Sequence, residues 1–543
     1  MKEYLRTKIT SALRALSYPD QPEPKLEKPR VAAHGDLTTN IAMVIAGSLG
    51  ASPRMIAQTI IDKLETDPSI IGKIEIAGPG FINFFFSDQY IKNRLHAIIV
   101  AGSEFGRSNV GNGLKTQVEF VSANPTGPLT VGHGRGAVCG DTIARLLEWT
   151  GYEVTREYYF NNAGRQMRIL GDSVRLRYLE ILEEKTFFPE DYYQGEYIRE
   201  IAQHLFQEYG DKLKTEPAEG VFKQTAEEEI FEDIRKSLER LGVHHDIFFN
   251  ENSLYENGQV EDVIRILREK NLAYDMDGAV WFRATAFKAE KDKVIVKNTG
   301  EPTYRLPDIA NHKNKIERGF KFIIDVLGAD HVATYPDVLA GIKALGYDES
   351  IVKVLIHQFV TIMQGGEAVK MSTRKANFIT LDELMDEVGP DVVRYFFLMR
   401  SMGSHLNFDL SLAREQSEEN PVYYLQYAYA RIAGIIRHAE SHGVDLKRIY
   451  DLSVLKAPEE LSLNKILSEF PDIVESCSAT YEPHRLAEYL HDVAGSFHKF
   501  YHEHRVVTEK EEMTGARITL CRAVKIVLAN GFSILGISTP ERM

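Results

Sequence analysis

Residues 122–136 could bind a phosphate group. They read SANPTGPLTVGHGRG and follow an apolar, β-prone run that includes Val118 and Phe120. Residues 137–149 then have the apolar spacing of a helix. The N-terminus of such a helix attracts anions through its free amide groups and its dipole, and His133 can add a hydrogen bond. A tight turn that needs glycines is the alternative explanation of this loop taken alone.

A second loop of the same kind lies far along the chain. Residues 370–377 read KMSTRKAN, after Gly365 and Gly366 and an apolar, strand-like run at residues 354–356. Two phosphate-binding loops that each follow a strand can meet at the carboxyl edge of one parallel sheet. The pair therefore indicates a nucleotide site on an α/β sheet more strongly than either loop does alone.

The two loops and several other motifs resemble those of a known family. His133 falls on the last position of the HIGH motif of class I aminoacyl-tRNA synthetases, and Lys370, Met371 and Ser372 fall on the start of their KMSKS loop. Further motifs, in the right order over nearly the whole chain, resemble arginyl-tRNA synthetases of the bacterial type. They are VEFVSANPTGP at 118–128, residues 298–308, GADH at 328–331, NPVYYLQYA at 420–428 and LGISTPERM at 535–543.

The resemblance implies a two-step reaction of protein biosynthesis. L-Arginine would react with ATP to form arginyl-adenylate and pyrophosphate, and tRNA-Arg would then accept the arginyl group with release of AMP. ATP is expected to enter as a substrate with Mg²⁺, whose protein ligands the sequence does not identify, and no tightly bound cofactor is expected. Neither step needs a protein nucleophile, so catalysis would rest on positioning and on stabilisation of phosphate charge.

The resemblance also implies which residues serve ATP, although two positions depart from the family pattern. Thr130 stands where the HIGH motif has its first histidine, and Thr373 replaces the second lysine of KMSKS. A threonine carries no positive charge at any pH. Arg374 or Lys375 could supply the missing charge. The expected catalytic residues are Thr130, His133, Lys370 and Arg374, and the expected ATP-binding residues are Gly132, His133, Gly134, Lys370, Met371 and Ser372.

These departures keep two alternative functions open. The first is a non-catalytic tRNA-binding paralogue, against which an intact arginine site argues. The second is a nucleotidylyltransferase, which can share a Gly-His loop but would have no evident use for the N-terminal module or the helical C-terminal region.

Arginine recognition requires carboxylates, because a guanidinium is a planar cation with five hydrogen-bond donors. Asp308 lies four residues after Tyr304, so both could face one pocket, although Asp308 could instead cap a helix. Glu119 sits inside an apolar strand, where a carboxylate is costly to bury without a cationic partner. The family positions that hold arginine correspond to Glu119, Asn124, Tyr304, Asp308 and His331.

The predicted fold is α/β, with a doubly wound parallel (Rossmann-type) catalytic sheet at residues 109–410. A mostly helical connective insertion is expected at about 166–290. An N-terminal α/β module at 1–108 would contact the tRNA D-loop, and an α-helical bundle at 411–543 would bind the anticodon region. The expected tRNA-binding residues are Phe81, Asn83, Tyr423, Gln426, Tyr427 and Arg431, with packing into a core as the alternative for Phe81 and the tyrosines.

Composition limits the setting more than the activity. The formal net charge of −14 does not suggest an RNA partner, yet affinity for phosphates depends on local basic surface. The three cysteines form no Cys-x-x-Cys pair, which favours a reducing compartment over a disulfide framework or structural zinc. No segment is expected to span a membrane. We expect a cytoplasmic protein, and the resemblance implies a monomer.

Overall fold

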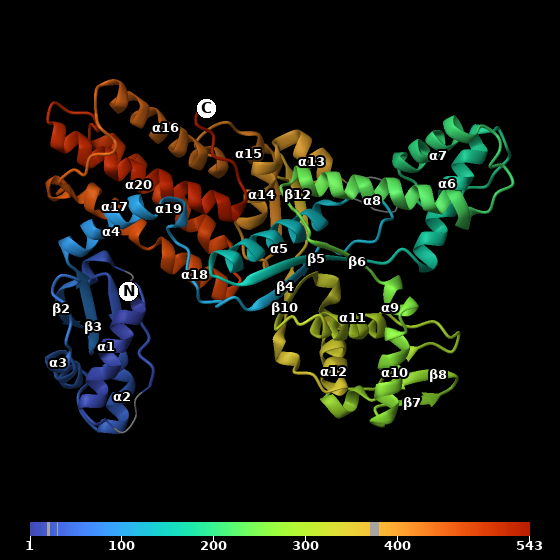
Figure 1. Ribbon diagram of the computed structural model, residues 1–543, viewed down its shortest axis with the longest axis horizontal. Helices are drawn as coiled ribbons and strands as arrows, with labels where there is room; N and C mark the ends of the chain where they lie inside the picture. Colours follow the sequence, from blue (N-terminus) through green and yellow to red (C-terminus); the bar gives the residue numbers. More distant parts are fainter. Residues whose placement is uncertain (19–21, 30, 370–378) are drawn as a thin grey trace. The chain divides into compact units, whose positions relative to one another are not determined.

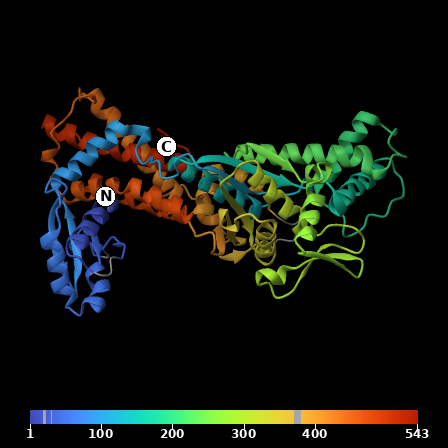
Figure 2. The same ribbon diagram turned by 60° about the horizontal axis from the view of Figure 1, so that its bottom comes forward.

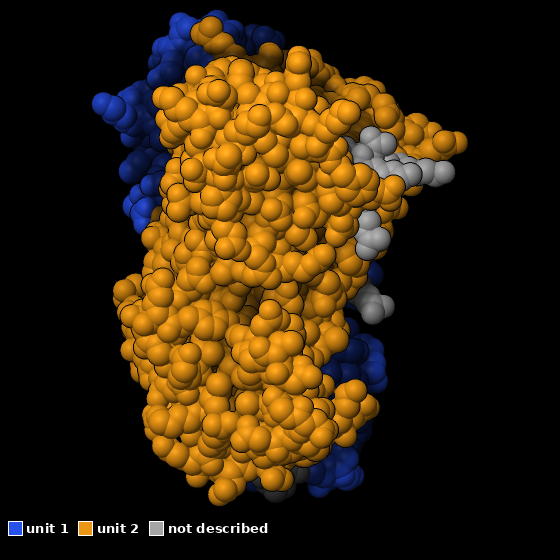
Figure 3. Space-filling model, turned by 90° about the vertical axis from the view of Figure 1, so that its right-hand side faces the viewer, with its two compact units in different colours: residues 1–105, 432–470, 495–527 blue, residues 106–431, 471–494, 528–543 orange. Residues whose placement is uncertain are grey.

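The computed structural model describes residues 1–18, 22–29, 31–369 and 379–543. Its contacts divide the chain into two compact units (Figure 3). Unit 1 comprises residues 1–105, 432–470 and 495–527, and unit 2 comprises residues 106–431, 471–494 and 528–543. The helical region after residue 411 therefore contributes segments to both units.

A five-stranded parallel sheet forms the centre of unit 2 (Figure 1). Its strand order is β11-β10-β4-β5-β6, and every neighbouring pair is parallel. The chain winds from β4 toward β6 on one side and later from β10 to β11 on the other, so the winding reverses between β4 and β10. This confirms the predicted doubly wound sheet and places its ligand-binding edge at that reversal. The strands are β4 (Lys115–Phe120), β5 (Glu153–Phe160), β6 (Ile247–Asn250), β10 (Phe322–Gly328) and β11 (Val352–His357).

Besides the central sheet, the described part of unit 2 up to residue 414 contains helices and smaller sheets. The helices are α5 (Val131–Trp149), α9 (Asn252–Glu256), α10 (Gln259–Glu269), α11 (Arg305–Glu317), α12 (Tyr335–Leu345), α13 (Leu381–Val388), α14 (Pro390–Leu398) and α15 (Leu410–Arg414). A further sheet has the order β13-β12-β14, from Glu367–Ala368, Val360–Gln364 and Leu406–Asp409.

The predicted insertion contains helices in both halves and strands only in its second half. Helices α6 (Gly164–Ile181), α7 (Glu196–Tyr209) and α8 (Lys223–Arg240) contact one another, as expected (Figure 2). The second half combines helices α9 and α10 with strands that the sequence does not predict, and β6 joins the main sheet. Strands β7 (Ala273–Met276), β8 (Ala279–Phe282) and β9 (Lys293–Val296) then form a separate antiparallel sheet. Four-residue strands are too short for apolar periodicity to reveal.

The N-terminal module of unit 1 has the predicted α/β character. Its antiparallel sheet has the order β1-β3-β2, from Leu37–Thr39, Phe81–Phe86 and Ile71–Ala77. Its helices are α1 (Lys2–Ala15), α2 (Ile41–Leu49), α3 (Pro53–Lys63) and α4 (Asp88–Ala101). Apolar residues spaced by four, such as Leu5, Ile9 and Leu13 of α1, pack with Ile82 and Phe84 of β3 in one core.

The C-terminal region is helical, as its periodicity predicts. It contains α16 (Pro421–Ser441), α17 (Pro458–Ser468), α18 (Phe470–Thr480), α19 (His484–Glu503) and α20 (Glu511–Leu535). The sequence analysis expects no segment long and apolar enough to span a membrane, but α20 is long and apolar enough by length and composition alone. However, 72% of its most apolar window is buried inside the protein, which is typical of a core helix.

Candidate active site

The backbone turns sharply where β4 ends, at the reversal of the sheet. Val121 and Ser122 have φ angles of 70° and 45°, a left-handed conformation that a β-branched residue rarely adopts. The turn is held by Ser122 Oγ, which donates to Glu119 Oε1 at 2.9 Å and accepts from the Tyr159 amide at 3.2 Å. Such strain persists where the surrounding structure fixes it, and it is common at functional sites.

His133 is held at the start of α5 by a reciprocal pair of hydrogen bonds. The Thr130 amide donates to His133 Nδ1 at 3.2 Å, and Thr130 Oγ1 accepts from the His133 amide at 3.4 Å. Because Nδ1 accepts, the proton of a neutral ring lies on Nε2, which can donate to a ligand. Burial lowers the pKa of His133, which favours that neutral form. Thr130 therefore caps the helix and orients His133.

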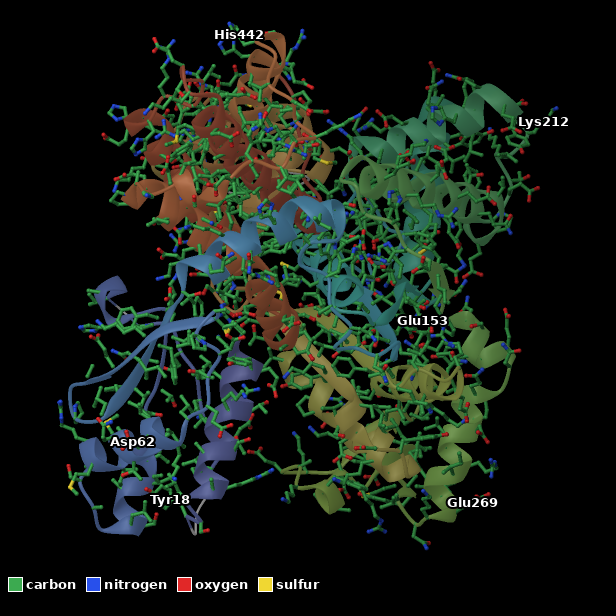
Figure 4. All side chains as sticks on the ribbon, turned by 60° about the vertical axis from the view of Figure 1, so that its left-hand side comes forward. Tyr18, Asp62, Glu153, Lys212, Glu269 and His442 are labelled. Atoms are coloured by element: carbon green, nitrogen blue, oxygen red, sulfur yellow. The ribbon has the colours of Figure 1, made fainter. Side chains whose placement is uncertain are left out.

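A cavity of about 730 Å³ opens beside this helix start. It is bordered by Asn124, Thr130 and His133, and also by Arg165 and residues 190–195 and Tyr197 of the insertion. The sequence predicts all three of the first group as site residues, and the structure brings them to one cavity. Lys212 lies at the outer end of the insertion, away from the sheet (Figure 4). The insertion residues that border the cavity are 190–195 and Tyr197.

Asn124 is fixed in this cavity by the strand-to-helix loop that follows β5. Its Oδ1 accepts from the Asn161 amide at 3.0 Å, and its Nδ2 donates to Gln166 Oε1 at 2.9 Å. Tyr197 Oη of α7 donates to the Thr126 carbonyl at 2.9 Å. These contacts rigidly connect the loop after β4 to the loop after β5 and to the insertion.

Two glycines of the first loop are explained by packing inside the protein. A Cβ at Gly134 would lie 2.6 Å from Leu381 Cδ1, and a Cβ at Gly136 would lie 2.9 Å from His357 Nε2. The resemblance to the family instead implies that Gly132 and Gly134 bind ATP. At Gly132 the nearest neighbour of a Cβ would be Thr130 Oγ1 at 3.7 Å, so this position fits that explanation better.

The second loop lies outside the described residues, including Lys370, Met371, Ser372, Thr373, Arg374 and Lys375. Described residues close to it nevertheless contact the first loop. Thr380 forms a β-bridge with Thr130, and the Leu381 amide donates to the Leu129 carbonyl at 2.8 Å. The chain that leaves the second loop therefore pairs with the chain that enters α5, as expected if both loops serve one sheet edge.

Three carboxylates lie side by side across the central sheet. Glu157 of β5 is in register with Glu119 of β4, which is in register with Asp325 of β10. Lys315 of α11 is fully buried against them, with Nζ 2.6 Å from Glu119 Oε2 and 2.9 Å from Asp325 Oδ1. A carboxylate buried in an apolar strand, such as Glu119, needs a cationic partner, and Lys315 is that partner.

Asp308 and His312 extend this group along α11. His312 contacts the Asp308 carbonyl through Nδ1 and Asp325 Oδ2 through Nε2, each at 2.7 Å. Burial opposes the charged imidazole, but the Asp325 carboxylate and the Asp308 carbonyl together outweigh it and raise the pKa of His312. Burial raises the pKa of Asp308 to about 7, with a smaller contribution from Glu119 and opposed by His312. Asp308 makes no cap contact, because the helix N-cap is Tyr304. The capping alternative for Asp308 is therefore wrong.

The other two predicted arginine residues lie at the edge of this region. Tyr304 directly precedes α11, yet it is 77% exposed, whereas Asp308 is partly buried. His331 lies in the 3₁₀ turn Ala329–Ala333 after β10, and its side chain is half exposed, 3.6 Å from Asp330. Contact of either residue with arginine remains a prediction.

Sequence reasoning missed Lys315 and Glu251. Glu251, 5% exposed, accepts from Tyr159 Oη and Asn161 Nδ2, both at 2.7 Å. Burial raises the pKa of its carboxyl group. For Lys315 a signal was present, because Asp308, His312 and Lys315 follow an i, i+4, i+7 spacing that places them on one helix face. For Glu251 no local pattern exists, since β6 was not expected.

Comparison with known proteins agrees with this geometry. Family models described as "Arginyl tRNA synthetase N terminal domain", "tRNA synthetases class I (R), catalytic domain" and "DALR anticodon binding domain" match residues 3–86, 94–394 and 425–543. The chain belongs to the arginyl-tRNA synthetase family. It is 52% identical over 520 residues to an arginine–tRNA ligase of Desulfotalea psychrophila, covering 95% of this chain and 94% of the relative.

Two further relatives extend the similarity over the full length. An arginine–tRNA ligase of Chlorobium phaeovibrioides is 50% identical over 552 residues, covering all of both chains. The solved structure of Thermus thermophilus arginyl-tRNA synthetase matches the fold with a TM-score of 0.79 at 21% identity, covering all of both chains. The arginyl-tRNA synthetase fold thus extends over the whole chain.

In the N-terminal domain, the structure separates the two residues expected to contact tRNA. Asn83 of β3 is 3% exposed, and its Oδ1 accepts from Thr38 Oγ1 of β1 at 2.6 Å. This bond joins two strands and gives Asn83 a structural role. Phe81 is half-buried and is not a member of the module's core cluster, unlike Phe84 and Phe86. Phe81 therefore fits the predicted RNA contact better than Asn83 does.

The start of α16 shows a similar division. Gln426 Nε2 donates to Asp391 Oδ2 at 2.8 Å and to Ser538 Oγ at 3.1 Å, so this amide holds the protein together. The rings of Tyr423 and Tyr427 stack with centroids 6.2 Å apart, and both side chains are partly exposed. Arg431 is exposed one turn further along. Their contact with tRNA remains a prediction.

Proposed function

We propose that the carboxylate-rich pocket at the reversal of the sheet binds the guanidinium group of L-arginine. As a member of its family, the chain is an arginine–tRNA ligase, which uses ATP to attach arginine to tRNA-Arg. One observation carries the assignment of the pocket. Among the described residues there, five carboxylates (Glu119, Glu157, Glu251, Asp308 and Asp325) surround three cationic side chains (His312, Lys315 and Arg318). A bound guanidinium would reduce this negative surplus.

Asp308 is the proposed main contact of the guanidinium. Of the five carboxylates, Glu119 and Asp325 already bind Lys315, Glu157 binds Arg318 at 2.6 Å, and Glu251 accepts two neutral donors. The raised pKa of Asp308 indicates a carboxyl group that its surroundings do not compensate. Glu119 and Tyr304 would frame the same group. Asn124, fixed between two loops, would hold the α-amino and carboxylate end, and His331 would border the pocket.

The activation step requires no protein nucleophile. The arginine carboxylate attacks the α-phosphate of ATP, a P–O bond to pyrophosphate breaks, and arginyl-adenylate forms. His133 Nε2 would donate to a phosphate oxygen at the start of α5, beside Gly132 and Gly134. Lys370 and Arg374, with the Ser372 hydroxyl, are proposed to bind the departing pyrophosphate, and the backbone around Met371 is proposed to frame the adenine base. The terminal ribose hydroxyl of tRNA-Arg then attacks the adenylate carbonyl and releases AMP.

Magnesium is proposed to accompany ATP. In the described part of the chain, no group of three or more His, Cys, Asp or Glu side chains could hold a metal ion. Mg²⁺ readily retains water and phosphate ligands, so ATP itself would supply most of its coordination. We further propose that the enzyme is a cytoplasmic monomer and that Phe81, Tyr423, Tyr427 and Arg431 contact tRNA, with Asn83 and Gln426 supporting them.

The pocket is tested by arginine-dependent aminoacylation of a tRNA-Arg transcript. Asp308→Asn removes the charge but keeps the shape, so the KM for arginine should rise about 30-fold or more while the KM for ATP stays within about twofold. Asp275→Asn serves as the matched control, because Asp275 is an exposed carboxylate of β7. An unchanged KM for arginine in Asp308→Asn would remove Asp308 from the pocket. Wild-type protein that binds tRNA-Arg without charging it would instead support the non-catalytic alternative.

A further inference from the structure

The row of three carboxylates has an internal cation that the reaction described above does not use. Lys315 reaches Glu119 of β4 and Asp325 of β10 with its ammonium group, and all three side chains are buried. Glu157 of β5, the third carboxylate, is bound by Arg318 one helical turn after Lys315. A buried charge without a partner is costly, so each carboxylate of the row depends on the lysine or arginine that pairs with it.

Glu119 connects this row to the pocket. Its Oε2 accepts from Lys315, and its Oε1 accepts from Ser122 Oγ, which lies in the strained turn after β4. The same serine oxygen accepts from the amide of Tyr159, whose Oη donates to Glu251. A movement of Glu119 would therefore disturb the turn that leads to Asn124 as well as the side chains around Asp308.

We propose that Lys315 is a positioning residue for arginine recognition: its ammonium group fixes Glu119 and Asp325, so that substrate arginine binds at Asp308 beside the row. This rests on the proposed arginine site. Lys315 provides the cation that pairs with Glu119 and Asp325, so these two carboxylates need no cation from a ligand. The surplus of negative charge is thereby left at Asp308, at the edge of the row, where the side chain is only partly buried.

The spacing of α11 supports this division. Asp308, His312 and Lys315 lie on one face of the helix. His312 contacts the Asp308 carbonyl and the Asp325 carboxylate, and that carboxylate also accepts from Lys315. The helix thus carries the proposed substrate ligand at its first turn and the internal cation two turns later. Displacement of Lys315 would alter both the charge and the placement of Asp308.

The first test is Lys315→Met, which keeps the length of the side chain and removes its charge. The KM for arginine should rise at least tenfold at pH 7.5, with the KM for ATP within about twofold of wild type. The acid limb of kcat/KM for arginine should also move to higher pH. The groups that face Lys315 and Asp308 are Glu119, Glu157, Glu251, Asp325 and His312, and loss of one positive charge makes their carboxyl groups harder to ionise.

Lys313→Met is the matched control. Lys313 is also buried and lies on the same helix, but it pairs with Glu317 at 2.8 Å and with Asp262 at 3.3 Å, away from the row. It should leave the KM for arginine and the acid limb unchanged. If Lys315→Met matches this control in both readouts, Lys315 has no positioning role.

A charge-balanced variant tests whether Lys315 positions Glu119 or only neutralises negative charge. It also provides a second test if Lys315→Met alone does not fold. Lys315→Met/Asp325→Asn removes one charge of each sign. Because Glu119 still lacks its partner, the KM for arginine should stay raised at least fivefold. A return to the wild-type KM would show that Lys315 only balances charge, and the proposal would be wrong. Asp308→Asn is measured in parallel: an unchanged KM there refutes the arginine pocket itself, whereas a raised KM there with normal Lys315 variants refutes only the role of Lys315.

Discussion

Unit 2 contains two buried clusters of charged side chains, and they differ in which sign is in excess. In the first, here called the arginine cluster, Arg394 donates to Asp141 Oδ2 at 2.6 Å, and Arg145 and Arg156 face the same carboxylate. In the second, here called the carboxylate cluster, the five carboxylates and three cations described above surround Lys315. The first has a surplus of cations and the second a surplus of anions.

The protein compensates the surplus positive charge of the arginine cluster but not the surplus negative charge of the carboxylate cluster. In the arginine cluster, Arg156 pairs with Glu148 at 2.6 Å, and the remaining donors of Arg394 go to the Leu535 and Leu241 carbonyls at 2.8 and 3.0 Å. Arg145 donates likewise to Ser533 and Gly242. Burial opposes ionisation of Asp141, but Arg394, Arg145 and Arg156 together outweigh it and lower the pKa of Asp141. In the carboxylate cluster the pKa of Asp308 is raised to about 7. A compensated cluster stabilises the fold, and an uncompensated one can bind a charged ligand.

The largest expected effect is on stability, in the arginine cluster. Arg394→Met leaves Asp141 with a weaker set of partners inside the protein and deprives two carbonyls of their donors. We expect the free energy of unfolding to fall by about 3–5 kcal/mol. Urea denaturation followed by circular dichroism measures this loss. The double variant Arg394→Met/Asp141→Asn should recover part of it, and a loss below about 1 kcal/mol would contradict the structural role of the cluster.

The second effect is on function, in the carboxylate cluster. Asp308→Asn should weaken arginine binding by about 2 kcal/mol or more, which appears as a higher KM for arginine. It should not lower the free energy of unfolding of the free enzyme. At pH 8 its unfolding free energy should equal or exceed that of wild type, because the folded state disfavours the charged form of Asp308. Paired denaturation and aminoacylation assays test this. A large loss of stability would make Asp308 a structural residue like Asp141.

The third effect is the pH dependence of arginine binding. The guanidinium stays protonated, whereas Asp308, with its pKa raised to about 7, takes up a proton as the pH falls through 7. The KM for arginine should therefore be constant above about pH 7.5 and rise by up to about tenfold per pH unit below 7. Steady-state kinetics from pH 5.5 to 8.5 measure it, with the KM for ATP as the internal control. A flat profile would show that Asp308 does not titrate in this range.

The smallest effect is expected at an exposed ion pair. Arg268 and Asp275 lie 2.8 Å apart, with side chains 49% and 70% exposed. Because solvent screens such a pair, Arg268→Ala should change the unfolding free energy by less than about 1 kcal/mol and leave the KM for arginine unchanged. An effect comparable with that of Arg394→Met would show that burial is not what makes the arginine cluster important for stability.

The sequence by itself determined the fold class, most elements and the position of the first loop. These features are local: a strand, a glycine-containing turn and an amphipathic helix each leave a periodic pattern in neighbouring residues. Asn124, Thr130 and His133 could be placed at one site because a short segment contains them all. The motifs around them also identified the family, since many separate segments match in order.

Only the tertiary structure decided how the charges compensate each other. Lys315 meets Glu119 because α11 packs over β4 and β10, and the row of Glu157, Glu119 and Asp325 exists because three strands share one register. Sequence patterns do not encode register between strands that lie far apart along the chain. The same holds for Asn83 and Gln426, whose amides bind partners at Thr38 and Asp391. Whether a polar side chain holds the fold or binds a ligand depends on such distant partners.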